Sequence, residues 1–126
     1  MQTPEELRYT SDHEWVRVVG STARVGITDY AQDALGDVVF VQLPVVGQKV
    51  LSGTTVSEVE STKSVSDIYA PLSGAISAVN TSLEQQPELL NSDPYNAGWI
   101  FEIEFDDIAA VDTLLDQSAY LALIEA

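Results

Sequence analysis

Hydrophobic and polar residues alternate in short runs along the first two thirds of the chain, and this pattern predicts a series of β-strands. Near the end of the series, a strand is predicted in which three apolar residues alternate with two glutamates, as a half-buried strand requires. Glycines and prolines separate the runs, so the connections should be tight turns. The predicted strands cover residues 14–19, 22–27, 38–43, 49–51, 54–60, 65–69, 75–79 and 100–105.

Helical patterns are confined to short segments. Residues 29–35 should form a helix, because Thr28 or Asp29 can cap its start and Gly36 can end it. Residues 82–95 contain two prolines and several Asn, Ser and Asp residues, which predicts that this segment is mostly loop. From residue 107 the pattern becomes helical up to residue 125: Ile108, Val111, Leu114 and Leu115 fall on one stripe, and residues 119–125 could form a second short helix. No linker divides the chain, so we expect one mainly β domain over residues 1–126.

Composition narrows the possible functions. Hydrophobic residues make up 45% of the 126 positions, enough for a folded core despite a net charge of −15. That charge disfavours nucleic acid and acidic membranes, which are bound through Lys and Arg, and it favours partners with basic surfaces.

The chain has no cysteine, and its apolar runs are too short to span a membrane. The acidic N-terminus lacks the features of a signal or transit peptide. We expect a cytoplasmic bacterial protein, or a mitochondrial matrix protein if a transit peptide has been removed.

Lys63 is the most informative single residue. It is one of only two lysines, and it lies between two predicted strands in Glu60-Ser61-Thr62-Lys63-Ser64. The sequence therefore predicts a hairpin over residues 54–70 with Lys63 at or near its tip. Most exposed lysines are simply solvated, and a salt bridge from such a turn contributes only about 0–1 kcal/mol. A lysine at a hairpin tip is also well placed for covalent modification, because an enzyme can reach the amine and the product can swing.

Four ordered segments resemble the motifs of glycine cleavage H proteins. The first is Ser11-Asp12-His13-Glu14-Trp15, and the second is Gly26-Ile27-Thr28-Asp29-Tyr30-Ala31-Gln32-Asp33 followed by Leu35-Gly36-Asp37-Val38-Val39. The third comprises Glu60-Ser61-x-Lys63, Ser66-Asp67 and Pro71-x-Ser73-Gly74, and the fourth is Asn91-x-x-Pro94-Tyr95-x-x-Gly98-Trp99. Together they span most of the chain in the expected order.

The resemblance implies a barrel-sandwich hybrid fold and a non-catalytic carrier with (R)-lipoate bound to Lys63 as an amide. It implies glycine decarboxylase, aminomethyltransferase, dihydrolipoyl dehydrogenase and a lipoate-attaching enzyme as partners. Lipoate would supply the sulfur chemistry that a chain without cysteine lacks. The aminomethyl-loaded arm would dock in a cleft lined by Glu14 and Asp67, whose carboxylates can form charge-assisted hydrogen bonds to its ammonium group.

Some residues depart from the family pattern or have other interpretations. Tyr30 and Ala34 stand where the family can have histidine, which leaves any arm contact from position 34 in doubt. The neighbours of Lys63 differ from the Met-Lys-Met pattern of biotin carriers. His13, the only histidine, has no nucleophile motif near it and is interpreted as structural. No calcium-loop or nucleotide motif is present, so neither a metal nor a nucleotide site is expected.

Two other functions remain open from the sequence alone. One is a stand-alone hydrolase that uses paired Asp and Glu residues. The other is a lipoyl carrier that serves a different complex or relays lipoate to other acceptors, and it would use the same Lys63.

Overall fold

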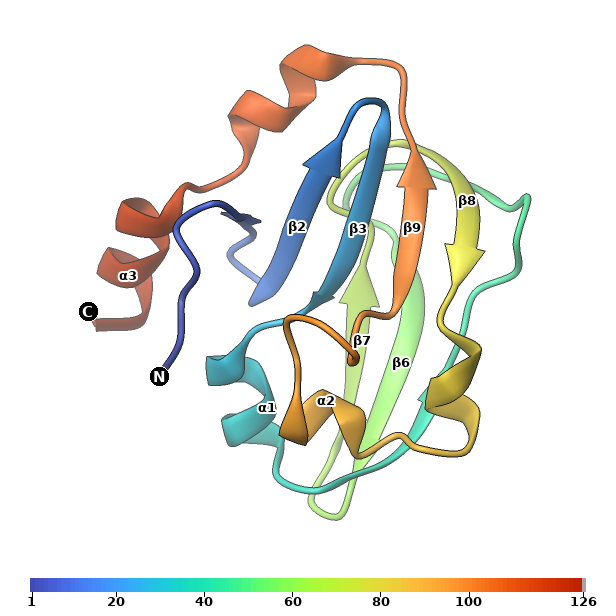
Figure 1. Cartoon of the computed structure of the whole chain (residues 1–126), viewed down its shortest axis with the longest axis vertical. Helices are drawn as coiled ribbons and strands as arrows, with labels where there is room; N and C mark the ends of the chain where they lie inside the picture. Colours follow the sequence, from blue (N-terminus) through green and yellow to red (C-terminus); the bar gives the residue numbers. More distant parts are fainter. Residues whose placement is uncertain (126) are drawn as a thin grey trace.

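The computed structural model describes residues 1–125 and contains two antiparallel β-sheets with short helices around them (Figure 1). The strands are β1 (Arg8–Tyr9), β2 (Glu14–Val19), β3 (Thr22–Ile27), β4 (Val38–Gln42), β5 (Lys49–Val50), β6 (Thr55–Ser61), β7 (Val65–Tyr69), β8 (Gly74–Val79) and β9 (Phe101–Glu104). The helices are α1 (Asp29–Leu35), α2 (Leu89–Ser92) and α3 (Gln117–Glu125), with 3₁₀ turns η1 (Thr81–Glu84) and η2 (Ile108–Thr113). The six-stranded sheet has the order β1-β2-β3-β9-β8-β5, and the three-stranded sheet has the order β4-β6-β7.

The main hydrophobic core lies between the two sheets. Ala23, Val25 and Ile103 contribute from the larger sheet, and Val41 and Val59 contribute from the smaller one. Each of these side chains is at most 3% exposed. In β9 alternate residues point to the core, so the period-2 pattern of its sequence follows directly from burial of one face.

A second, smaller core joins the two ends of the chain. We call it the terminal aromatic cluster; its buried members are Leu7, Tyr9, Trp15, Tyr95 and Tyr120. The Tyr9 and Tyr120 rings stack with centroids 4.5 Å apart, which fixes α3 against β1. A Cβ at position 26 would lie 2.6 Å from the Trp15 ring, so only glycine allows β3 to approach this ring. Figure 1 shows α3 and the N-terminal segment side by side at the left, outside the two-sheet core.

The mainly β fold with short helices is confirmed, and neither sheet closes on itself. The predicted strands 14–19, 22–27 and 65–69 and the helix 29–35 match the structure at both ends, including the Thr28 and Gly36 caps. The other predicted strands differ by one residue at one end or at both ends. The two-residue strand β1 has no period long enough to be read from the sequence.

The expectations for the helical parts are met only in part. Residues 82–95 are not only loop: η1 and α2 form there because Leu83 and Leu90 are buried and the Asn80 side chain caps η1. The second short helix expected over residues 119–125 is present within α3, but residues 108–115 do not form one helix with a buried apolar stripe. Ile108 is 64% exposed, η2 is a 3₁₀ turn, and Leu115 forms a β-bridge with Tyr9 before α3 begins. No helix within residues 1–125 is long and apolar enough to cross a membrane.

Candidate functional site at the β6–β7 turn

Residues 61–64, which we call the lysine turn, connect β6 to β7 at the bottom of Figure 1. Two-residue hairpin loops usually need positive φ angles, yet neither Thr62 nor Lys63 has one. The Ser61 side chain takes over part of the backbone pairing instead. Its Oγ accepts hydrogen bonds from the backbone N–H of Lys63 at 3.1 Å and of Ser64 at 3.0 Å. The backbone N–H of Ser61 donates to the Ser64 carbonyl at 2.8 Å. The turn is therefore ordered by its own polar groups while its side chains stay exposed.

The base of the lysine turn rests on the segment that follows α1. The backbone N–H of Thr62 donates to the Asp37 carbonyl at 3.0 Å. Asn91 fixes this segment: its Nδ2 donates to the Gly36 carbonyl at 2.9 Å, and its Oδ1 accepts from the Val38 N–H at 2.9 Å. The turn is thus tied to α1 and α2 as well as to its own sheet.

Lys63 is exposed, and its aliphatic chain passes over Gly36. A Cβ at position 36 would lie 2.8 Å from Lys63 Cε and 3.5 Å from its Nζ. Gly36 also has φ of +80°, a conformation that side chains disfavour. Glycine therefore ends the helix and at the same time leaves space for the lysine chain.

An apolar pocket of about 310 Å³ opens beside the lysine turn, between α1 and β7. Its apolar walls come from α1 and β3 on one side and from β7 on the other, and His13 and Tyr30 add two rings that lie 4.7 Å apart. The pocket also takes in Ser64, the neighbour of Lys63. Its lining residues are Asp12, His13, Ile27, Tyr30, Ala31, Ala34, Leu35, Ser64, Val65, Ser66 and Ile68.

His13 is held in this wall by the C-terminal helix. Its Nδ1 lies 2.9 Å from the Tyr120 hydroxyl, which lies 2.7 Å from Thr28 Oγ1. Thr28 Oγ1 also accepts from the Ala31 N–H at the start of α1, so α1, α3 and the pocket wall share one polar network. His13 has a φ of +67°, and burial lowers the pKa of its ring, which favours the neutral form. These contacts agree with the structural role predicted for His13.

Glu14 is buried, with 1% of its surface exposed, and lines a different pocket of about 270 Å³. Its carboxylate accepts hydrogen bonds from the Tyr69 N–H at 2.7 Å and from Thr10 Oγ1 at 3.1 Å. These bonds favour the ionised form, but loss of solvation is the larger effect and raises the pKa of Glu14 to about 8. Glu14 therefore holds a proton at neutral pH unless a cation comes close.

Asp67 does not join Glu14 in one pocket. It pairs with Glu58 in the β6–β7 register and is exposed, whereas its neighbours Ser66 and Ile68 face the apolar pocket. A strand alternates its side chains, so Asp67 lies on the outer face of the three-stranded sheet. Of the two predicted acids, only Glu14 is in an enclosed site.

Three residues that build the site were not assigned these roles from the sequence. Ser61 and Asn91 lie in recognised motifs, but the motifs do not show their partners. The bonds of Ser61 depend on the shape of the turn, and Asn91 bonds to backbone groups more than 50 residues away. No sequence pattern around Tyr120 indicated its role, because its partners His13 and Thr28 lie more than 90 residues away in the chain. Within residues 1–125, no group of three or more His, Cys, Asp or Glu residues could hold a metal ion.

An ordered, exposed lysine on a two-sheet β domain is the arrangement of a carrier that presents a swinging arm. Comparison with known proteins gives the same class. The family model described as glycine cleavage H-protein matches residues 7–126. A glycine cleavage system H protein of Mycobacterium bovis is 61% identical over 124 residues, covering 93% of this chain and 92% of the relative. One from Mycobacterium tuberculosis is 60% identical with the same coverage.

A solved structure leads to the same assignment. The crystal structure of a glycine cleavage system H protein from Mycobacterium marinum superposes with a TM-score of 0.87 and 41% identity, covering 98% of this chain and 100% of that one. The chain belongs to the glycine cleavage H-protein family, the lipoyl carriers of the glycine cleavage system.

Proposed function

We propose that Lys63 carries lipoate in an amide bond and that this residue alone is the attachment site. The observation that supports it is the lysine turn itself, which is closed by Ser61 and leaves the Lys63 side chain exposed. The other lysine, Lys49, is also exposed but lies in the two-residue strand β5, paired with Ala75. A modifying enzyme needs an amine that projects from an ordered turn, and only Lys63 meets this condition.

The residues around Lys63 fit the chemistry of a lipoyl arm. When bound, lipoate supplies a disulfide and dithiol pair that the cysteine-free chain cannot supply. The apolar pocket of about 310 Å³ begins at Ser64 and can shelter the hydrocarbon part of the arm. The chain itself presents and shelters the arm, and the catalytic steps belong to its partners. These partners are glycine decarboxylase, aminomethyltransferase and dihydrolipoyl dehydrogenase, together with a lipoate-attaching enzyme.

Recognition of the aminomethyl-loaded arm is proposed for Glu14 in particular. An ammonium group near this buried carboxyl would favour its ionised form and gain a charge-assisted hydrogen bond. Asp67 stays a prediction, and its exposed position on the outer face offers no support for it. Glu14→Ala should accept lipoate normally but release ammonia and formaldehyde from the loaded form faster than the parent. An equally long-lived loaded form would show that Glu14 does not contact the arm.

The attachment site is tested by substitution and intact mass. Lys63→Arg keeps the positive charge but removes the primary amine, so we expect a folded protein whose mass gains no lipoyl group after incubation with a lipoate-attaching enzyme. Lys49→Arg is the matched control and should be fully lipoylated. Lipoate found on Lys49, or on the Lys63→Arg protein, would contradict the proposal.

Reconstitution tests which complex the carrier serves. The lipoylated protein should support glycine decarboxylation when it is mixed with glycine decarboxylase, whereas a carrier for a different complex would not. Activity of the unmodified protein alone on hydrolase substrates would instead favour a stand-alone hydrolase.

A further inference from the structure

Two of the three arginines lie directly opposite one another on the outer face of the six-stranded sheet. Arg17 of β2 and Arg24 of β3 are register partners, and like charges in that relation destabilise a sheet. They line a pocket of about 240 Å³ together with Val19, Thr22 and Glu102. In a chain with 20 acids and 5 bases, a sheet that places two bases side by side needs an explanation.

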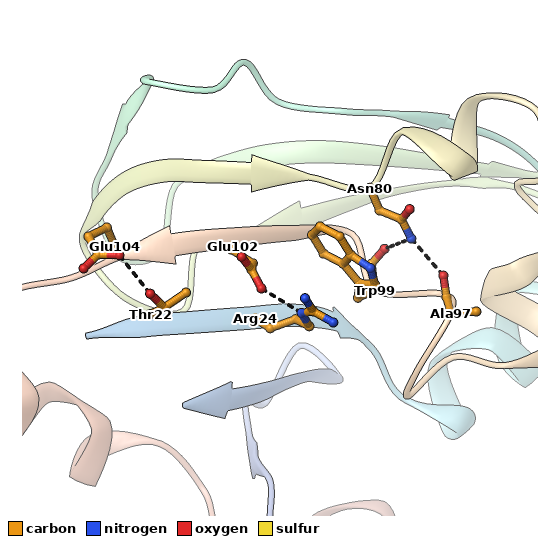
Figure 2. Close-up of polar contacts among 7 residues, drawn as sticks. All are labelled: Thr22, Arg24, Asn80, Ala97, Trp99, Glu102 and Glu104. Carbon is orange, nitrogen blue, oxygen red and sulfur yellow. Dashed lines mark hydrogen bonds and ion pairs between the residues drawn. The ribbon is translucent and has the colours of Figure 1, made fainter. Parts of the chain in front are cut away.

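Each guanidinium is positioned by a tryptophan. Arg24 lies 4.4 Å from the centroid of the Trp99 ring, and its Nε donates to Glu102 Oε2 at 2.8 Å (Figure 2). Arg17 lies 5.4 Å from the Trp15 centroid. Stacking on an aromatic face fixes a guanidinium plane while leaving N–H groups at its edge. Both arginines are therefore held in place before any ligand arrives.

In the described part of the chain, only one of the two guanidiniums is paired with a carboxylate. Within residues 1–125, Glu102 is the only carboxylate bonded to either guanidinium, and the Arg17 side chain makes no ion pair or hydrogen bond. Glu104, the next acid along β9, accepts hydrogen bonds from Ser21 and from Thr22, the latter drawn in Figure 2. These two hydroxyls lower the pKa of Glu104, and its carboxylate bonds to them and to neither guanidinium. The pocket thus carries two positive charges and one negative charge.

We propose that the Arg17–Arg24 pocket binds a small oxyanion, a phosphate or a carboxylate. Such a group can accept paired hydrogen bonds from the two guanidiniums and relieve their mutual repulsion. The net charge of −15 does not prevent this, because salt screens charges farther away than roughly 8 Å at physiological ionic strength. The pocket belongs to the six-stranded sheet and the lysine turn to the other sheet, so binding does not depend on lipoate.

Tryptophan fluorescence can report binding directly, because Trp15 and Trp99 are the only tryptophans and one lies under each arginine. The unmodified protein is titrated with inorganic phosphate and then with citrate, with chloride added to hold the ionic strength constant. We expect a saturable change in fluorescence. Arg17→Gln should weaken phosphate binding about tenfold or more, because it removes one charged partner of the anion.

Arg8→Gln is the matched control, because it removes the same charge from a residue outside the pocket. Its phosphate affinity should equal that of the parent, and thermal melts should show that both variants are folded. An equal loss in both variants would mean that affinity follows net charge only, and a signal without saturation would mean that no site exists. Either result overturns the proposal. Binding of a polyglutamate peptide without binding of phosphate would also overturn it, in favour of an acidic protein partner.

Discussion

The lysine turn and the terminal aromatic cluster differ in what holds them. The turn is exposed, and four hydrogen bonds involving Ser61 maintain its shape. The cluster consists of buried rings from both ends of the chain, with Tyr9, Trp15 and Tyr120 each 0% exposed. The first region exposes the Lys63 amine, the proposed attachment point, and contributes little burial, whereas the second contributes burial and exposes no reactive group.

This difference shows how a small carrier can separate function from stability. Hydrophobic burial is the main favourable term in folding, so the cluster and the two-sheet core should determine the free energy of unfolding. The turn can then be modified without cost to the fold. The two regions still meet at one point, because Tyr120 bonds to His13 in the wall of the apolar pocket.

The largest effect on stability is expected from removal of the Tyr120 side chain. Tyr120→Ala leaves a cavity under α3 and should lower the free energy of unfolding by about 3–5 kcal/mol, the usual cost of deleting a buried aromatic ring. Denaturant titration measures this cost. Tyr120→Phe keeps the ring and removes only the bonds to Thr28 and His13, so it should cost less. Equal losses in the two variants would show that the hydroxyl, not packing, anchors the helix.

A somewhat smaller effect should appear in the pH dependence of Glu14. Because the pKa is raised to about 8 in the folded protein, the folded state binds the proton more tightly than the unfolded state. The contribution of Glu14 to the free energy of unfolding is therefore fully present below the ordinary glutamate pKa. It is lost as the pH rises toward 8. Between these two pKa values the loss should grow by about 1.4 kcal/mol for each unit of pH.

Glu14→Gln isolates this effect, because the neutral amide does not titrate and all other acids are unchanged. The variant should gain stability relative to the parent as pH rises from 5 to 8, measured by urea unfolding at each pH. A difference between the two proteins that stays constant over this range would show that Glu14 is ionised in the folded state.

Ser61 tests the lysine turn with a smaller expected effect. Ser61→Ala removes the Oγ acceptor of the Lys63 and Ser64 N–H groups, but water can replace it at this exposed site. The stability loss should be about 1 kcal/mol or less. Amide hydrogen exchange at Lys63 and Ser64 should become faster, with no change at Tyr120. Unchanged exchange would mean that the strands alone hold the turn.

The sequence predicted those parts whose signal is local. Helix α1 has its cap residues beside it, and β7 and β9 show the alternation of half-buried strands. The motif around Lys63 also predicted its turn. What could not be predicted depends on residues far apart in the chain: the bridge between Tyr9 and Leu115, the exposure of Ile108, and the separation of Glu14 from Asp67. Each is decided by tertiary packing, which overrides local helix and strand preferences.

Lipoylation itself should have the smallest effect on stability. The modified side chain projects from a turn that is complete without it, and exposed changes usually alter stability by about 0.5 kcal/mol or less. Unmodified and lipoylated proteins should therefore melt within a few degrees of each other, and Lys63→Arg should melt with the unmodified protein. A clear rise in melting temperature on lipoylation would mean that the unloaded arm already lies in the apolar pocket, because only burial can supply that stabilisation. In that case Ala34→Glu, which places a charge in the pocket wall, should abolish the rise without preventing attachment. The turn and the core would then be coupled through the arm, and the separation between the two regions would hold only for the unmodified protein.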